Sequence, residues 1–154
     1  MNNVNFTITR ESVYNEVAKT TSYGGKKAQG DENAYQRMRT TPEDEEMLQR
    51  FWHEACDMIT SMVKPFINSV SDDTDFNLSL AMPSRYDTTL NAMLQATAFS
   101  FIVNQIIAKW YDMANKDEAR KYDDTANGLA TKFKATVFYR KKPTLIQDGN
   151  TEKQ

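Results

Sequence analysis

The chain has 154 residues, the size of a single domain that buries its own core without disulfides or structural metals. Its one cysteine excludes an internal disulfide framework, and its net charge of −2 argues against a surface that is basic all round. Only 5 Gly and 4 Pro accompany 8 Met, 8 Phe, 7 Tyr and 2 Trp, a composition that favours long helices with broad apolar faces.

The N-terminal segment predicts a strand, a short helix and a flexible loop. Residues 4–8 alternate and are rich in β-branched side chains, which predicts a short strand. Apolar residues at helical spacing predict a helix from about Thr9 to Lys19. Three glycines between residues 20 and 33 predict a mobile loop, and a further short helix is expected around residues 32–39.

The next segment carries a strong helix start signal. Thr41 is a good N-cap residue, Pro42 suits the first helical position, and four carboxylates follow in the first turn. We expect a long helix from there to about Val70, with Pro65 kinking it or ending its regular part. Its apolar stripe comprises Met47, Leu48, Phe51, Trp52, Ala55, Met58, Ile59, Met62, Val63 and Phe66.

A turn at residues 71–74 separates this helix from an alternating segment, 76–82, that predicts a half-buried strand. Pro83 ends the strand. Asp87 then provides a cap for a second long helix over about residues 88–113. Because this helix is apolar nearly all round between residues 96 and 110, it should be the most buried element.

A third helix is predicted from the capping-box spacing of Asn115 and Glu118. Apolar positions at helical spacing carry it to about Arg140, and Pro143 ends it. The alternative that residues 134–142 form a strand stays open, because Thr136–Tyr139 is β-branched and aromatic.

These elements predict a mainly α fold: a helical bundle with two long helices and a third C-terminal helix, plus one or two short β-strands. We expect three parts in the chain. Residues 1–40 hold the N-terminal strand, short helix and flexible Gly/Lys loop, residues 41–143 form the bundle, and residues 144–154 form a polar tail.

Charge is unevenly distributed along the chain. Residues 1–113 hold 10 basic and 15 acidic side chains, whereas residues 114–154 hold 9 basic and 6 acidic ones. Lysine or arginine side chains with no acid between them form a basic run: Lys132, Lys134, Arg140, Lys141 and Lys142. The run is suited to DNA phosphates or to an acidic protein surface, and equally to stabilising the C-terminus of its own helix.

Two lysines within the predicted loop form a second candidate partner-binding site. Lys26 and Lys27 follow Gly24 and Gly25, which superficially resembles a phosphate-binding loop. A P-loop requires Ser or Thr after the lysine, between a strand and a helix, but Ala28 stands there. We therefore expect a loop that contacts a partner protein, with no nucleotide cofactor.

Signals for metal sites and catalysis are weak. His53 and Cys56 are three residues apart, but a zinc site needs about four ligands and the chain has no other histidine or cysteine. The spacing is also poor for a nucleophile and base, so Cys56 is expected in the core. Asp73 opens a calcium-loop-like run that lacks the required glycine and final glutamate. We predict a non-enzymatic protein without a metal.

Several blocks of the chain resemble small virion proteins of tailed phages and prophages. The blocks are Phe6–Thr9 with Val13–Thr20, Thr41–Asp44 with Phe51–Cys56, Leu80–Asp87, Lys109–Tyr111 and Tyr139–Pro143. This resemblance implies a structural protein similar to helical head–tail connector (adaptor) proteins, which form a ring beneath the portal. Its expected partners are copies of itself, the portal and other neck or tail proteins.

The predicted location is the virion, with assembly in the host cytoplasm. No secretory signal is evident at the N-terminus, and the most apolar stretch is interrupted by polar residues, so no membrane association is expected. The alternative function is a nucleic-acid-binding or regulatory helical protein that uses the basic run. The partner-binding residues expected from sequence are Lys26, Lys27, Arg140, Lys141 and Lys142.

Overall fold

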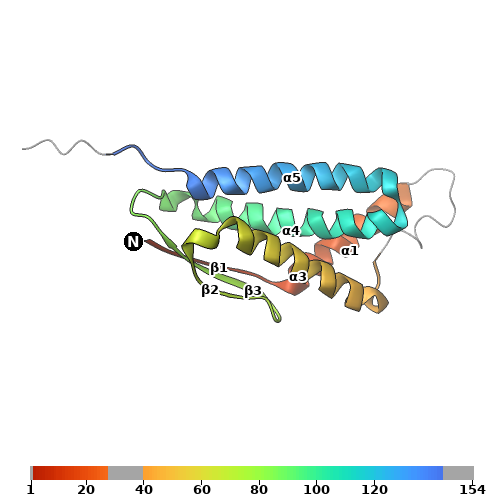
Figure 1. Ribbon diagram of the computed structural model, residues 1–154. Coiled ribbons are helices and arrows are strands. Elements are labelled where there is room, and N and C mark those ends of the chain that lie inside the picture. Colours follow the sequence, from red (N-terminus) through yellow and green to blue (C-terminus); the bar gives the residue numbers. More distant parts are fainter. Residues whose placement is uncertain (1, 28–39, 144–154) are drawn as a thin grey trace, which may run out of the picture.

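The computed structural model describes residues 2–27 and 40–143. Helices dominate, and three short strands form one small sheet, which confirms the predicted mainly α class (Figure 1). The elements are β1 (Asn2–Ile8), α1 (Arg10–Lys27), α3 (Glu45–Met62), β2 (Ile67–Ser71), β3 (Phe76–Met82), α4 (Asn91–Ala114) and α5 (Lys116–Phe138).

The sheet is antiparallel, with the strand order β1–β3–β2. β1 pairs along its whole length with β3, from Asn2 opposite Met82 to Ile8 opposite Phe76. Buried and exposed side chains alternate along both strands, as the sequence predicts for half-buried strands. One sheet face therefore carries apolar side chains to the core, while the other presents small uncharged residues such as Asn5 and Ser79.

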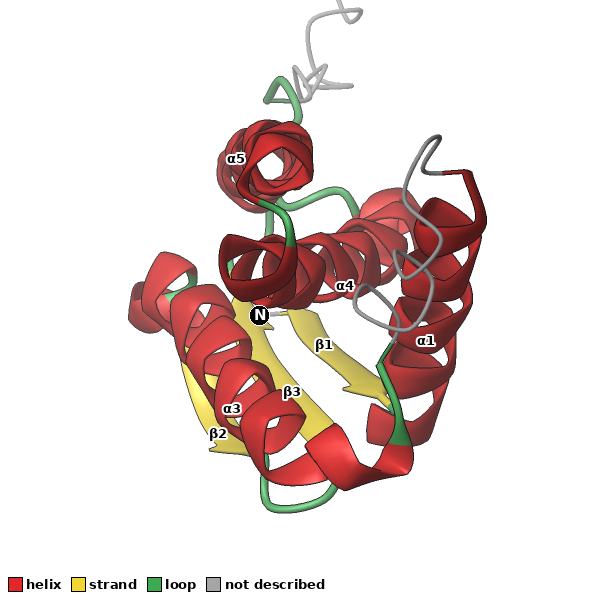
Figure 2. Cartoon of the chain, turned by 90° about the vertical axis from the view of Figure 1, so that its right-hand side faces the viewer, coloured by secondary structure: helices red, strands yellow, loops and turns green. Residues whose placement is uncertain are grey.

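Helix α4 is the centre of the molecule. Figure 2 shows it above the sheet, flanked by α3 on one side and α1 on the other, with α5 lying across its outer surface. Its side chains are buried on all these sides, as predicted from its nearly continuous apolar sequence. The fully buried positions include Leu94, Ala98, Phe101, Ile102, Ile106, Ile107 and Tyr111.

The first helix is longer than the sequence suggests. A helix ending near Lys19 and a loop from residue 20 were expected, but α1 continues through both glycines to Lys27. Thr21 explains part of this extension, because it is fully buried and its hydroxyl donates to the Val17 carbonyl at 2.9 Å. The same oxygen accepts from the Thr40 N–H at 3.0 Å. The rest of the predicted loop and the helix at 32–39 lie outside the described residues.

The prediction that the second helix reaches Val70 is wrong. α3 ends at Met62, a 3-10 turn spans Lys64–Phe66, and the chain then forms β2. Pro65 lacks an N–H and clashes with a preceding turn, so the helix cannot continue through it. The β-branched residues that follow pair with β3 instead, across an irregularity in register between Ile67 and Ser69.

The Asn115 side chain caps α5 as predicted, accepting from the Glu118 N–H at 3.4 Å. Asp87 instead caps the 3-10 turn Thr88–Leu90 that leads into α4, and its carboxylate accepts from the Thr89 N–H at 3.0 Å. α5 remains helical to Phe138 and Tyr139 is extended. Of the two alternatives for residues 134–142, the strand is therefore wrong, and the helix ends two residues earlier than expected.

Among the described residues, the helical stretch Thr88–Ala114 is the one whose length and composition would allow it to cross a membrane. Half of its most apolar window is buried within the protein. Core helices of packed domains commonly have this composition, and the position of α4 between the sheet and three helices gives it that role here.

Candidate interaction surfaces

The predicted basic run lies at one end of the elongated molecule, where α5 ends. Arg140 folds back onto the helix, and its Nη1 donates to the carbonyls of Val137 and Tyr139, both at 2.8 Å. Its guanidinium carbon also lies 5.5 Å from the ring centre of Phe66. Arg140 thus stabilises the end of α5, which is one of the two roles that the sequence left open for these cations.

The two lysines that follow continue as an extended segment. The Lys141 N–H donates to the Arg85 carbonyl at 2.8 Å, and Arg85 Nε donates to the Lys141 carbonyl at 2.9 Å. These two hydrogen bonds attach the segment to the loop after β3, while the side chains of Lys141 and Lys142 are exposed. The two lysines are therefore positioned for contact with a partner, whereas Arg140 is engaged within the chain.

Exposed aromatic side chains accompany these cations. Phe138 is 50% exposed and Tyr139 is 51% exposed, although both occupy the end of a helix whose other apolar residues face α4. Tyr139 and Lys132 line a hollow of about 380 Å³, together with Met93 from the start of α4. We call this surface, made by Lys132, Lys134, Phe138, Tyr139, Lys141 and Lys142, the basic end.

Carboxylates open α3 at the opposite end of the molecule, and charges of both signs lie beside them: Lys109, Lys116 and Arg120 share a hollow with Asp112 and Asp123. The first residues of α3 and the turn between α4 and α5 both lie there (Figure 1). The Asp44 carboxylate accepts from the N–H and hydroxyl of Thr41, at 2.8 and 3.0 Å, so it serves as a cap. We call the following group the acidic end: Glu43, Glu45, Glu46, Asp112 and Asp117.

The structure does not bring the two predicted lysine sites together. Lys26 and Lys27 form the last turn of α1, which ends near the α4–α5 turn and thus far from the basic end (Figure 1). The helical backbone at these residues also contradicts the loop that was expected to carry them. A helix C-terminus presents carbonyls, so this segment also lacks the N–H cradle of a phosphate-binding loop.

His53 and Cys56 do not form a joint site. Cys56 is fully buried, and burial strongly raises the pKa of its thiol, so it is a core residue as predicted. His53 is half-buried, and its Nδ1 lies 3.0 Å from Asp72 Oδ2, which connects α3 to the β2–β3 turn. Among the described residues, no three His, Cys, Asp or Glu side chains are grouped to hold a metal ion.

The calcium-like run at Asp73 is a turn, as the sequence favours. Asp75 Oδ1 accepts from the Arg10 N–H at 3.1 Å, and the Asp73 carbonyl accepts from Arg10 Nη1 at 3.4 Å. β3 begins directly afterwards at Phe76. These oxygens hold the start of α1 against the sheet.

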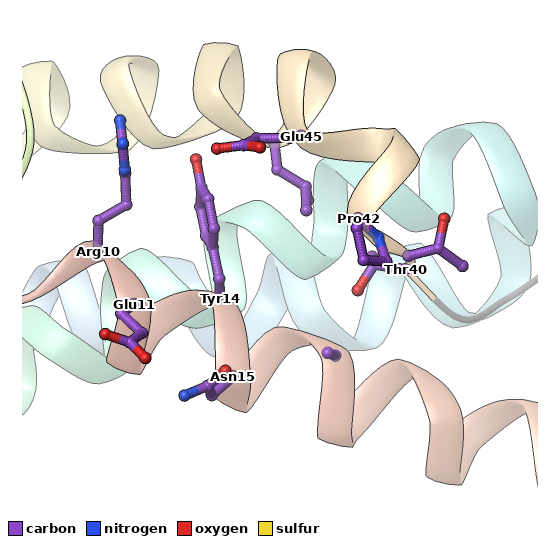
Figure 3. Close-up of a pocket in the computed structure, with 10 residues that line it drawn as sticks. Arg10, Glu11, Tyr14, Asn15, Thr40, Pro42 and Glu45 are labelled. Atoms are coloured by element: carbon purple, nitrogen blue, oxygen red, sulfur yellow. The ribbon is translucent and has the colours of Figure 1, made fainter.

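A cavity between α1 and α3 was not predicted from sequence. It has a volume of about 390 Å³, and Tyr14 points into it between Arg10 and Glu45 (Figure 3). The Tyr14 hydroxyl is buried and has no hydrogen-bond partner among the described residues, and burial raises its pKa to about 12. Its ring contacts Trp52 edge-on, with the ring centres 6.5 Å apart. These residues are distant in the sequence, so no local motif could announce the cavity.

Comparison of the chain with protein-family models, with curated proteins and with solved structures finds no match. Assignment of a function therefore depends on the surfaces described above and on the resemblance carried by the sequence blocks.

Proposed function

We propose that the chain is a non-enzymatic structural protein of a tailed-phage virion, which assembles head to tail into a ring as a head–tail connector. The observation that carries the proposal is the difference between the two ends of the molecule. Exposed lysines gather at the basic end, and the carboxylates that open α3 lie at the other end of one helical body (Figure 1). These carboxylates can match the lysines of the basic end in a second copy.

Head-to-tail contact between unlike surfaces is a heterologous interface, and such interfaces close into rings when the rotation between copies allows it. Complementary potentials mainly guide encounter and orientation, and apolar contacts then lengthen the lifetime of the complex. Phe138 and Tyr139 provide such apolar area within the basic end. Lys141 and Lys142 surround it with exposed positive charge.

The proposed partners beyond the chain itself are the portal and other neck or tail proteins, and the proposed location is the virion, reached from the host cytoplasm. The resemblance in sequence supports these partners and this location. The packed helical body supports a structural role, because α4 fixes the relative positions of the two ends over its 24 residues, about 36 Å.

Charge reversal at each end tests the proposal. We expect light scattering and negative-stain electron microscopy to show rings for the unaltered chain. The double variant Lys141→Glu with Lys142→Glu should weaken assembly at least tenfold at about 0.15 M salt, because it opposes the acidic end of the next copy. Adding Glu45→Lys and Glu46→Lys to the same chain should restore assembly.

A matched control uses exposed lysines that belong to neither end. Lys19→Glu with Lys121→Glu makes the same change in net charge but leaves both ends intact, so assembly should persist. An unaltered chain that stays monomeric at high concentration and low salt, alone and with portal proteins, would contradict the proposal.

A nucleic-acid-binding function is the second candidate, and the exposed aromatic rings among lysines favour it. Bases stack on aromatic faces while lysines neutralise phosphates, and the basic end offers Tyr139 next to Lys141 and Lys142. A gel-shift titration at several salt concentrations tests this function. Binding should weaken steeply with salt and require these lysines with Lys134 and Arg140; no shift at low salt eliminates it.

A further inference from the structure

A groove lies between the end of β1, at Thr7 and Ile8, and the exposed face of the first half of α4. It has a volume of about 560 Å³, and every side chain that lines it is uncharged. Ala92, Gln95, Ala96 and Phe99 form its helical wall, and Ser12 closes one end. In a chain with 26% charged residues, an uncharged groove of this size is a distinct surface.

The other wall of the groove is a sheet edge. β1 has β3 as its one neighbour in the sheet that the described residues form. Gln95 Nε2 donates to the Thr7 carbonyl at 3.2 Å, so this carbonyl points away from β3 toward α4. Because backbone direction repeats every second residue in an antiparallel strand, Asn5 and Asn3 direct their backbone groups to the same free edge.

An extended peptide fits these two walls. Its backbone would hydrogen-bond to the edge of β1, as in other cases of strand addition, and its alternate side chains would face the helix. Ala92 and Ala96 are small and exposed, which leaves room for a branched aliphatic side chain against the half-buried Phe99 ring. A charged side chain would lose its hydration there without gaining a partner.

The C-terminal segment of the chain has the matching sequence. Residues 144–147 read Thr-Leu-Ile-Gln, an uncharged stretch with β-branched and aliphatic side chains between the lysines before it and Asp148 after it. Eleven residues follow Pro143, and a segment of that length spans about 36 Å when extended. The segment is therefore long enough to reach across an interface.

The position of the described C-terminus favours the groove of a second copy. Lys141 is bonded to Arg85, three residues beyond Met82, and Met82 pairs with Asn2 at the far end of β1 from Thr7. Residues 139–143 then continue past the end of α5, away from the body (Figure 1). The five residue-to-residue steps from Lys141 to Ile146 span about 17 Å when extended, no more than β1 itself from Asn2 to Thr7. To reach the groove of the same copy, the segment would have to turn back along β1 and be fully extended.

We propose that residues 144–147 of one copy add as a strand to the edge of β1 in the next copy and place an aliphatic side chain against Ala92, Ala96 and Phe99. This inference rests on the proposed self-assembly and names the contact that holds it. The basic and acidic ends orient the copies, and the inserted segment prolongs the contact.

A peptide-binding experiment tests the groove apart from assembly. The chain truncated after Pro143 retains every described helix and strand. A fluorescent peptide of residues 142–150 should bind it, and Ala96→Arg should weaken that binding at least tenfold by placing a charge in the groove. Asn127→Arg, an equally exposed helical position on α5, should leave binding unchanged. A peptide with Leu145→Ser and Ile146→Ser should fail to bind.

Assembly of the full chain provides the second readout. Truncation after Pro143 and Ala96→Arg should each reduce ring formation, while circular dichroism stays unchanged. Peptide binding by a full chain that never assembles supports the groove and contradicts the proposed function. Assembly that persists without residues 144–154, with no peptide binding, overturns the groove and leaves the proposed function standing. NMR provides a third readout. If the backbone resonances of Gln95 and Ala96 in a monomer shift when residues 144–154 are removed, the segment lies in the groove of its own copy, which would overturn insertion between copies.

Discussion

Helices α4 and α5 are almost equal in length, with 24 and 23 residues, but they have opposite roles. α4 is surrounded by the sheet, α1, α3 and α5, and its charged residues are limited to Lys109 and Asp112 near one end. α5 packs on α4 and, through Phe138, on the Phe66 ring 5.4 Å away; it buries a narrow stripe of residues and exposes the remainder of its surface to solvent. One helix therefore stabilises the fold, and the other displays charge at defined positions.

The difference follows from how each helix distributes apolar residues. α4 is apolar around most of its circumference between Ala96 and Trp110, so it gains by contact on most sides, while Ala92, Gln95 and Ala96 stay exposed. α5 has apolar residues on one face only; its first half carries charges of both signs, and its second half carries Lys132 and Lys134 without an acid. Substitutions of buried residues in α4 should therefore lower the free energy of unfolding strongly, whereas substitutions on the exposed face of α5 should change it little.

The largest effect is expected in the interior of α4. Phe101 is fully buried, and Phe101→Ala should lower the free energy of unfolding by about 3–5 kcal/mol, through lost apolar contact and the cavity left behind. Urea denaturation measures it. On α5, the exposed Lys134→Ala should stay within about 0.5 kcal/mol of the unaltered chain. A loss below about 1 kcal/mol for Phe101→Ala would contradict the central position of α4.

An intermediate effect is expected where the two helices join. The Asn115 side chain caps α5, so Asn115→Ala should cost about 1 kcal/mol of unfolding free energy. Asn127→Ala, in the exposed interior of the same helix, is the matched control and should be neutral or slightly stabilising, because alanine favours a helix more than asparagine. Equal losses for both variants would show that the cap does not contribute.

The smallest effect is a gain in stability at the contact between α4 and α5. The Tyr111 hydroxyl is buried and has no hydrogen-bond partner among the described residues, while the ring packs 5.4 Å from that of Tyr122. Tyr111→Phe keeps the ring and removes the unpaired hydroxyl, so the free energy of unfolding should rise by about 0.5 kcal/mol. Thermal unfolding measures the change; a loss of stability instead would indicate a bond from the hydroxyl.

The same tyrosine predicts an effect of alkaline pH. Burial raises the pKa of Tyr111 well above the ordinary value of 10.0, and nearby Tyr122 and Glu118 raise it further. Above pH 10 the unfolded chain releases this proton while the native chain retains it, so stability should fall as the pH rises. Tyr111→Phe should flatten this decline in urea denaturation between about pH 9 and 11; an unchanged slope would exclude Tyr111 as its source.

Local sequence signals predicted several elements correctly because their physical causes are local. Asn115 caps α5, and Asp87 caps the 3-10 turn before α4, each through a group two or three residues away; the alternation over residues 76–82 needs only a sheet with one buried face. β2 escaped prediction because apolar spacing continues past Pro65 as if the helix did too. β2 is stabilised by its hydrogen bonds to β3, and this contact between two segments is not visible in the spacing within either one.

The candidate surfaces also divide into features that follow from local sequence and features that depend on tertiary packing. The sequence by itself determined the mainly α class, the buried character of α4 and the basic run, since these depend on composition and on spacing within one element. Only the tertiary structure decided that Arg140 is engaged with Phe66 and two carbonyls, that Lys26 and Lys27 belong to a helix, and that β1 borders an uncharged groove. The Arg140–Phe66 contact, the end of α1 held by Thr21 against Thr40, and the groove beside β1 each join residues far apart in the chain, which local spacing does not encode.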